Sequence, residues 1–262
     1  MPTHLHLHRH TRRKLTLVLG LAVAAMAMVW LMPPIPQDPA YHRFADQRTL
    51  LGVPHFRDTL SNLAFLVIGG LGAWQVMRGP PAGGLRELRM GYLVFFLGLA
   101  LIAVGSGYYH LHPTNERLVW DRLPIVISLM AFFAVVVGER VSPAFGRRWL
   151  WPLLLAGGAS VIYWAVTEAR GSGDLRPYVV VQFLPVLLIP IILVLFPSRL
   201  SREGYLWATL LTYAAAKAAE LWDEEVFHIV GVFSGHTLKH LLAAASAGLF
   251  LLALRRRTLI VH

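Results

Sequence analysis

Two histidines, His236 and His240, stand four residues apart at the start of the apolar run SGHTLKHLLAAASAGLFLLALRRR (234–257). This spacing places both imidazoles on one face of a helix, from which they can bind the same metal ion. A third histidine, His110, lies in GSGYYH (105–110) and completes a set of three. Three histidines with an open fourth position for water are the arrangement expected of a catalytic zinc site. An isolated HxxxH pair is also compatible with histidines that only form hydrogen bonds near lipid headgroups.

Two more polar residues accompany these histidines. Ser106 stands four residues before His110, and Asp121 stands eleven residues after it. Taken alone, Ser106 is compatible with a small packing residue of a helix, and Asp121 with a helix N-cap followed by Pro124. Polar side chains inside apolar spans are costly, so their occurrence together at one membrane depth indicates a functional site.

The elements that must position these residues are membrane-spanning helices. Of the 262 residues, 56% are hydrophobic and only 15% are charged, which is more apolar than one soluble core of this size requires. Apolar runs of membrane-spanning length predict eight helices, near 15–32, 59–77, 90–110, 123–138, 149–167, 177–196, 204–222 and 236–254. The sequence therefore predicts an all-α, polytopic membrane helical bundle.

The chain has a net charge of +10, but its lysines and arginines are distributed as membrane topology requires, so the charge does not indicate nucleic-acid binding. Lysines and arginines precede the first span and follow the second, fourth, sixth and eighth, whereas the intervening loops are balanced or acidic. The positive-inside rule then places both termini in the cytoplasm and the histidines, Ser106 and Asp121 near the outer face. The chain has no cysteine, so any metal must be held by His, Asp or Glu.

We find no internal repeat and no soluble domain, and expect one bundle with five segments. The first apolar run lacks a clear small-x-small cleavage site, so we favour a retained anchor over a signal peptide. The segments are a cytoplasmic His/Arg-rich tail (1–14), an additional N-terminal transmembrane helix (15–33), an outer-face loop (34–58), a seven-helix domain (59–254) and a cytoplasmic tail (255–262). The first tail, HLHLHRH, is expected to be disordered, with adventitious metal binding as the alternative.

Charged and proline residues inside the later spans allow two interpretations each. Lys217 and Glu220 are three residues apart, as expected of a buried ion pair that fixes helix packing, or of a group that orients a ligating histidine. Lys239 is expected to point away from the histidines, toward headgroups or the acidic residues 223–225. Pro185 and Pro190 suit plain packing, or a kink that opens a gap for an acyl chain.

Four short motifs resemble the alkaline ceramidase family, within the wider group of seven-helix membrane hydrolases that includes the progestin and adiponectin receptors. They are SNLAF (61–65), GSGYYH (105–110), the Asp121 of WDRLP (120–124) and HTLKH (236–240). The resemblance covers residues 55 to about 254, so the first span is an addition to a seven-helix core. It implies a zinc amidohydrolase in which His110, His236 and His240 bind Zn²⁺, Asp121 positions or deprotonates the water, and Ser106 steadies the water or the oxyanion.

The same resemblance bears on calcium, substrate and location. The segment FADQRTLLGVPHFRDTLSN offers Asp46 and Asp58 but lacks the run of acidic and asparagine calcium ligands found in the eukaryotic enzymes, which argues against a calcium requirement. FADQRTLLGVPHF resembles instead the bacterial members of the family. The implied substrate is a membrane lipid, ceramide or a related N-acyl lipid. If the chain is bacterial, the site is expected near the periplasmic face of the inner membrane.

Three other functions remain open from the residues alone. The first is a seven-helix receptor or regulator that keeps a structural zinc site, which a fourth protein ligand would close. The second is an intramembrane serine protease with Ser106 in VGSG (104–107) as nucleophile, although its histidine is on the same helix. The third is a transporter that uses Lys217 and Glu220, although neither paired broken helices nor an inverted repeat is present.

Overall fold

The computed structural model describes the backbone of residues 3–260 and the side chains of residues 11–260. The metal binding considered for the histidines of the N-terminal tail lies outside the described side chains. Over the described residues the chain is helical and has no strand. The α-helices are α1 (Thr3–Leu31), α2 (Phe56–Ser61), α3 (Leu63–Arg78), α4 (Arg89–Leu111), α5 (Asn115–Arg140), α6 (Pro143–Ala169), α7 (Arg176–Leu195), α8 (Gly204–Leu221), α9 (Asp223–Val230) and α10 (Gly235–Arg256).

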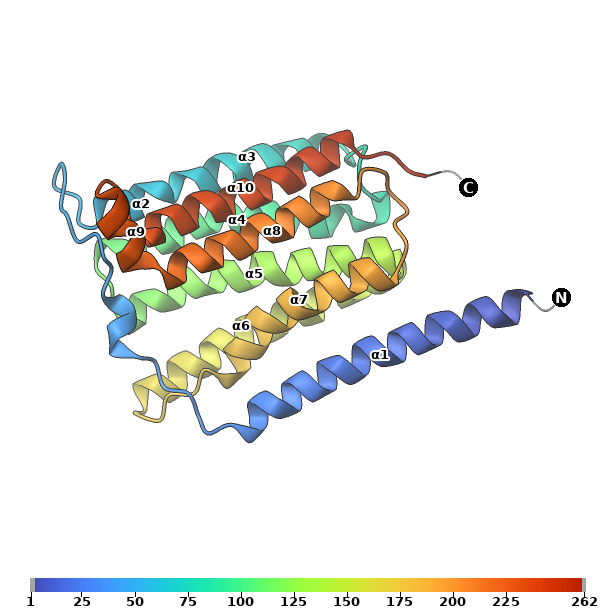
Figure 1. The fold of residues 1–262 in the computed structure, drawn as a ribbon, viewed down its shortest axis with the longest axis horizontal. Helices are drawn as coiled ribbons and strands as arrows, with labels where there is room; N and C mark the ends of the chain where they lie inside the picture. Colours follow the sequence, from blue (N-terminus) through green and yellow to red (C-terminus); the bar gives the residue numbers. More distant parts are fainter. Residues whose placement is uncertain (1–2, 261–262) are drawn as a thin grey trace.

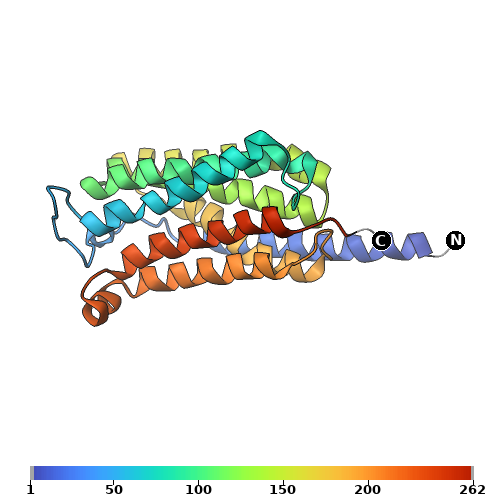
Figure 2. The same ribbon diagram turned by 90° about the horizontal axis from the view of Figure 1, so that it is seen from above.

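These helices confirm the predicted all-α membrane bundle with one additional N-terminal helix. Among the residues that the structure describes, seven spans are long and apolar enough to cross a membrane, with α2 and α3 forming one of them. The eighth expected span, α8, does not meet the same hydropathy criterion, as expected of a helix that carries Lys217 and Glu220. It nevertheless lies beside α10 within the bundle (Figures 1 and 2).

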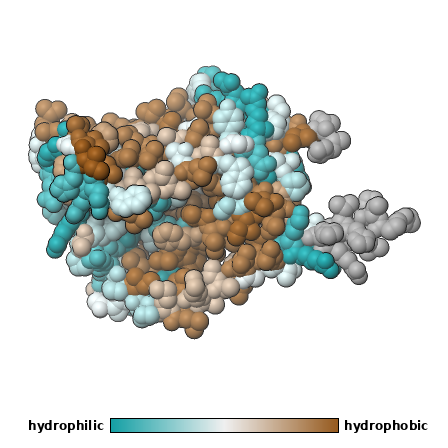
Figure 3. Space-filling model, viewed as in Figure 1, coloured by the Kyte–Doolittle hydropathy of each residue, from teal (hydrophilic) through white to brown (hydrophobic). Residues whose placement is uncertain are grey.

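The additional helix α1 lies at the edge of the bundle, where it packs on α7 (Figure 1). It begins at Thr3, within the segment for which a tail was expected, and its membrane-length part is Thr11–Leu31. Many of its large apolar side chains are exposed, among them Leu19, Met28 and Trp30. Apolar side chains also cover the middle of the bundle, and polar ones gather mainly toward its ends (Figure 3). This distribution suits a bundle surrounded by lipid.

Local capping signals set the helix starts and correct one interpretation of Asp121. The hydroxyl of Thr114 accepts a hydrogen bond from the Arg117 amide, so α5 begins at Asn115, well before the expected residue 123. Asp121 is therefore a buried residue inside the helix, and its interpretation as an N-cap is wrong. Ser234 caps α10 in the same way by accepting from the Thr237 amide, which starts that helix directly before His236.

The end of the bundle opposite the histidines is closed by a buried ion pair. Arg257 donates two hydrogen bonds of 2.8 Å to the carboxylate of Glu139 and a third of 3.0 Å to the carbonyl of Gly83. The hydroxyl of Tyr92 donates to the same carboxylate at 2.7 Å. These contacts join the end of α10 to α5, α4 and the loop before α4. Charge pairs this deeply buried are costly to break on one side only.

Replacing Arg257 by methionine is expected to lower the free energy of unfolding by about 3–5 kcal/mol, because the carboxylate of Glu139 would stay buried without its cation. Chemical unfolding in detergent, followed by helical circular dichroism, measures this loss. The neighbouring Arg256→Met is the matched control, since Arg256 is exposed. Equal losses in the two variants would show that the ion pair does not stabilise the bundle.

Candidate metal centre

Three buried histidines from two helices converge at the end of the bundle that carries α9. His110 lies in the last turn of α4, and His236 and His240 lie in the first two turns of α10. One ring nitrogen from each lies within 4.8 Å of the others, and the Nε2 atoms of His110 and His236 are 3.3 Å apart. The three residues are at most 6% exposed. The structure thus brings together the predicted set, in which His110 is 126 residues from His236.

The donor set fits a tetrahedral metal ion. With metal-to-nitrogen bonds of about 2.0–2.1 Å, the nitrogens of a tetrahedral zinc site are about 3.3–3.4 Å apart. The distance between the Nε2 atoms of His110 and His236 agrees with this separation. Among the residues with described side chains, no cysteine, aspartate, glutamate or further histidine joins the cluster. A metal ion held by these residues would therefore keep a coordination position for a non-protein ligand.

Ser61 and the backbone of Asp58 hold His240 in the orientation that ligation needs. The Ser61 hydroxyl donates to the Asp58 carbonyl at 2.9 Å and lies 2.8 Å from Nδ1 of His240. Because that hydroxyl hydrogen is already used, the Nδ1–H of His240 donates to Ser61 and leaves Nε2 free to bind metal. In the sequence, Ser61 belongs to the motif SNLAF, which did not indicate its partner.

Two carboxylates that were not among the expected site residues, one buried and one partly exposed, position the start of α10. Asp58 is fully buried, and its Oδ1 accepts hydrogen bonds from the hydroxyls of Ser234 and Thr237. Asp223, the first residue of α9, accepts from the backbone amide of His236 at 2.7 Å. The sequence held only a weak signal for these two roles. Asp58 ends a segment of mixed charge, and Asp223 begins the acidic run 223–225.

Two glycines permit the close helix contacts at this end. A Cβ atom on Gly105 would lie 2.0 Å from the carbonyl oxygen of Trp120, so α4 and α5 approach here at backbone distance. This contact sets the buried Ser106 beside the buried Asp121, whose carboxylate the serine hydroxyl can reach. A Cβ atom on Gly235 would lie 2.1 Å from the carbonyl oxygen of Ala219, which brings α10 equally close to α8.

The segment 34–55, which we call the strap, crosses this end of the bundle (Figure 1). Its Phe44 is only 4% exposed, and its ring centroid lies 4.7 Å from that of His110 and 4.6 Å from that of His236. The amide of Ala45 donates to Asp223, the same carboxylate that receives the His236 amide. Phe44 therefore covers one side of the histidine cluster, a role that no sequence pattern indicated.

Polar contacts fasten the strap on both sides of Phe44. The ring of His42 bridges the hydroxyl of Tyr109 and the side chain of Asn115, each at 2.9 Å. Arg48 donates to the carbonyls of Gly231 and Val232, beyond α9.

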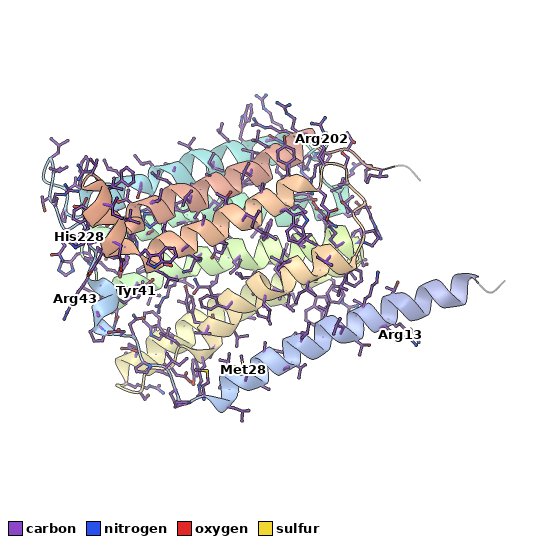
Figure 4. All side chains as sticks on the ribbon, in the orientation of Figure 1. Arg13, Met28, Tyr41, Arg43, Arg202 and His228 are labelled. Carbon is purple, nitrogen blue, oxygen red and sulfur yellow. The ribbon has the colours of Figure 1, made fainter. Side chains whose placement is uncertain are left out.

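Figure 4 shows Tyr41, Arg43 and His228 at this end of the molecule and Arg13 and Arg202 at the opposite end.

Asp46 of the strap is held by two arginines. Arg48 donates to both oxygens of its carboxylate, at 2.7 and 2.8 Å, and Arg57 donates at 3.2 Å. Burial alone would raise the pKa of Asp46, but the hydrogen bonds from Arg48 and Arg57 prevail and lower it below its ordinary value. The carboxylate of Asp46, one of the two aspartates in this segment, is thus paired with two guanidinium groups.

Lys239 does not point away from the histidines, as the sequence had suggested. Because it follows His236 by three residues, it shares a helix face with it, and its Nζ lies 2.9 Å from Nε2 of His236. Its carboxylate partner is Glu220 of α8, at 3.0 Å, and not one of residues 223–225. Glu220 also pairs with Lys217, so the expected Lys217–Glu220 pair is present and continues to the metal centre.

Comparisons with known proteins agree with this architecture. No curated protein matches the chain. The family model for ceramidases matches residues 53–196, which is more than half of the chain and includes Ser61, Ser106, His110 and Asp121. The matched region ends at α7, and α10 then supplies the two remaining histidines to the cluster. The chain belongs to the ceramidase family.

Proposed function

We propose that this protein is a membrane-embedded, zinc-dependent amidohydrolase that cleaves the N-acyl amide bond of ceramide or a related N-acyl lipid. The products are a fatty acid and an amine, which is a sphingoid base when the substrate is ceramide. The observation that carries the proposal is the convergence of His110, His236 and His240 in a bundle of the ceramidase family. Family membership supports the amide-hydrolase activity, and the histidine geometry supports zinc.

The three histidines would hold Zn²⁺ through ring nitrogens, and the ion would supply a water nucleophile near neutral pH and polarise the carbonyl. The protein provides the remaining functions. Ser61 fixes the tautomer of His240, and Asp223 fixes the start of α10 at His236. The buried carboxylate of Asp121 takes the proton of the attacking water and passes it toward the leaving nitrogen.

Ser106 lies beside Asp121 and steadies the water or the developing oxyanion with its hydroxyl. The geometry favours this role over that of a protease nucleophile. A serine nucleophile needs a base hydrogen-bonded to it. Within the described part of the chain, no histidine nitrogen forms a hydrogen bond with Ser106, and its neighbour is a carboxylate.

The alternative of a receptor or regulator with a structural zinc site is less well supported. Structural zinc sites in proteins have four protein ligands. The cluster found among the described side chains has three, all histidines. This open position favours hydrolysis over a purely structural site.

The histidine end of the bundle is proposed to face outward, which is the periplasm in a bacterial inner membrane, with both termini in the cytoplasm. Arg13 and Arg202 lie at the opposite end (Figure 4). The start of α1 and the end of α10 also lie at that opposite end (Figure 2). The positive-inside rule assigns the arginine-rich end to the cytoplasm.

Hydrolysis of defined lipids tests the proposal. Purified protein loaded with zinc would be incubated in mixed micelles with ceramides of several acyl lengths and with N-acyl amino lipids. Mass spectrometry should detect fatty acid and amine in equal amounts, and zinc chelation should stop their formation. Protein that binds zinc and cleaves none of these lipids would contradict the proposed activity and favour the receptor alternative.

Ser61→Ala is expected to weaken zinc binding about 10-fold, because Nδ1 of His240 would lose the nearer of its two partners and keep only the Asp58 carbonyl at 3.2 Å. Competition with a chromogenic chelator measures the zinc dissociation constant. Thr59→Ala is the control, since the hydroxyl of Thr59 in the same short helix donates to the carbonyl of Pro54 and to no histidine. Equal zinc affinities for the wild type and Ser61→Ala would remove the serine from the metal centre.

A further inference from the structure

A lysine ammonium group lies directly beside the proposed metal position. The Nζ atom of Lys239 is 2.9 Å from Nε2 of His236 and 3.0 Å from Oε1 of Glu220. The side chain is 18% exposed, so it is not sealed in the core as the three histidines are. A lysine in this place is unexpected, because a cation next to a metal ion is repelled by it. Its presence requires an explanation beyond helix packing.

The hydrogen bonds of Lys239 change when a metal binds. An ammonium group has three donors, and here one is directed at Glu220 and one at Nε2 of His236. That nitrogen offers a single lone pair, which a metal ion would use. The donor directed at His236 would then lack an acceptor while lying at the metal centre. At this partly exposed position an oxygen of another molecule, water or substrate, is the natural partner of that donor.

The charges around Lys239 also favour a negatively charged oxygen. Glu220 is shared between Lys239 and Lys217, so this group of three side chains carries one excess positive charge. The three side chains are only partly exposed, so their charges interact more strongly than they would in bulk water. Hydrolysis of an amide places negative charge on the carbonyl oxygen as water attacks.

We propose that Lys239 is a further catalytic residue, whose ammonium group donates a hydrogen bond to the oxygen of the scissile carbonyl and afterwards to the fatty-acid carboxylate. This inference rests on the proposed amide hydrolysis. The oxygen of water bonds to the carbonyl carbon while the π electron pair moves to the carbonyl oxygen. The pair then returns, the C–N bond breaks, and the nitrogen takes the proton released by water. The carboxylic acid so formed gives its proton to the free amine, which leaves a carboxylate and an ammonium ion. Lys239 keeps its own protons throughout.

Lys217 provides a matched control for the competing explanation, in which the ion pairs only join α8 to α10. Both lysines pair with Glu220, but only Lys239 contacts a histidine of the cluster. A purely structural network would be weakened by the loss of either lysine. A role at the carbonyl oxygen belongs to Lys239 alone.

The test compares Lys239→Met, Lys239→Arg and Lys217→Met in the full-length, zinc-loaded protein. We expect Lys239→Met to lower kcat about 10²- to 10³-fold, as found when an oxyanion donor is removed. Binding of a fluorescent long-chain fatty acid should weaken at least about tenfold. Zinc itself should bind severalfold more tightly, because a neighbouring cation is gone. Lys217→Met should stay within about threefold of the wild type in all three measurements.

The possible results distinguish a failure of the proposed role of Lys239 from a failure of the proposed amide hydrolysis. Equal losses of kcat in Lys239→Met and Lys217→Met, or weaker zinc binding by Lys239→Met, would reduce Lys239 to a structural residue and overturn the inference. Should Lys239→Met fail to fold, Lys239→Arg must bind the fatty acid nearly as well as the wild type, and loss of that binding in a folded protein overturns the inference too. A wild type without amidase activity would contradict the proposed function, and fatty-acid binding would still decide whether Lys239 binds the oxygen.

Discussion

Replacing His236 and His240 together by alanine is expected to eliminate zinc binding and hydrolysis. Two of the three ligands of the cluster would be lost, and a single remaining histidine does not retain zinc. Zinc content, measured by atomic absorption, should fall from about one ion per chain to none. Activity should fall at least about 1,000-fold, since the metal contributes several kcal/mol to transition-state stabilisation and each 1.4 kcal/mol is tenfold.

The design of this experiment removes two ambiguities. Protein that begins at residue 11 lacks the histidines of HLHLHRH, which would otherwise add zinc to the count. His112→Ala is the matched control, because His112 is an exposed histidine two residues beyond His110. That variant should retain both zinc and activity. Zinc retained at one ion per chain in the double variant would place the metal elsewhere and leave hydrolysis without its nucleophile.

Asp121→Asn is expected to lower kcat about 10²- to 10⁴-fold while zinc content stays at the wild-type level. The amide has nearly the shape of the carboxylate but cannot accept the proton of water at neutral pH. Zinc should remain because Asp121 does not belong to the cluster of ligating groups. Initial rates with a saturating N-acyl lipid, together with zinc analysis of the same sample, separate the two effects.

Two comparisons define the role of Asp121. Glu116→Gln removes an exposed carboxylate near the start of the same helix and should leave activity unchanged. Ser106→Ala should retain measurable activity, whereas its complete inactivity with full zinc content would support the serine-protease alternative. If Asp121→Asn lost zinc along with activity, Asp121 would be a ligand and not a proton acceptor.

The sequence predicted the helices and the three histidines well because both signals are local. Apolar runs of membrane length define the spans, and an i, i+4 pair of histidines is complete within one turn of α10. His110 could be added to this pair because successive spans alternate in direction, which places the end of α4 and the start of α10 at the same membrane face. Hydropathy and topology were sufficient for these predictions.

Other parts of the site depend on contacts that hydropathy does not encode. Phe44 is one aromatic residue in a loop without periodicity, and its position follows from strap contacts with α4 and α9. The predicted direction of the Lys239 side chain was wrong, because the prediction considered only lipid headgroups and residues 223–225 as its partners. Its observed direction follows from its i, i+3 relation to His236 and from the packing of α8 against α10. The N-cap interpretation of Asp121 failed because hydropathy marks where the apolar run begins and not where the helix begins. The cap residue Thr114 starts α5 about two turns before Asp121.

The cover that Phe44 forms over one side of the histidines bears on which substrate concentration the proposed lipid hydrolase responds to. Under the proposed function, we expect the acyl lipid to reach the site from within the bilayer, between helices. The reaction then follows the number of substrate molecules per membrane lipid and not the amount per volume of water. Diluting the substrate with inert lipid slows such an enzyme, whereas diluting the whole suspension with buffer leaves each catalytic cycle unchanged.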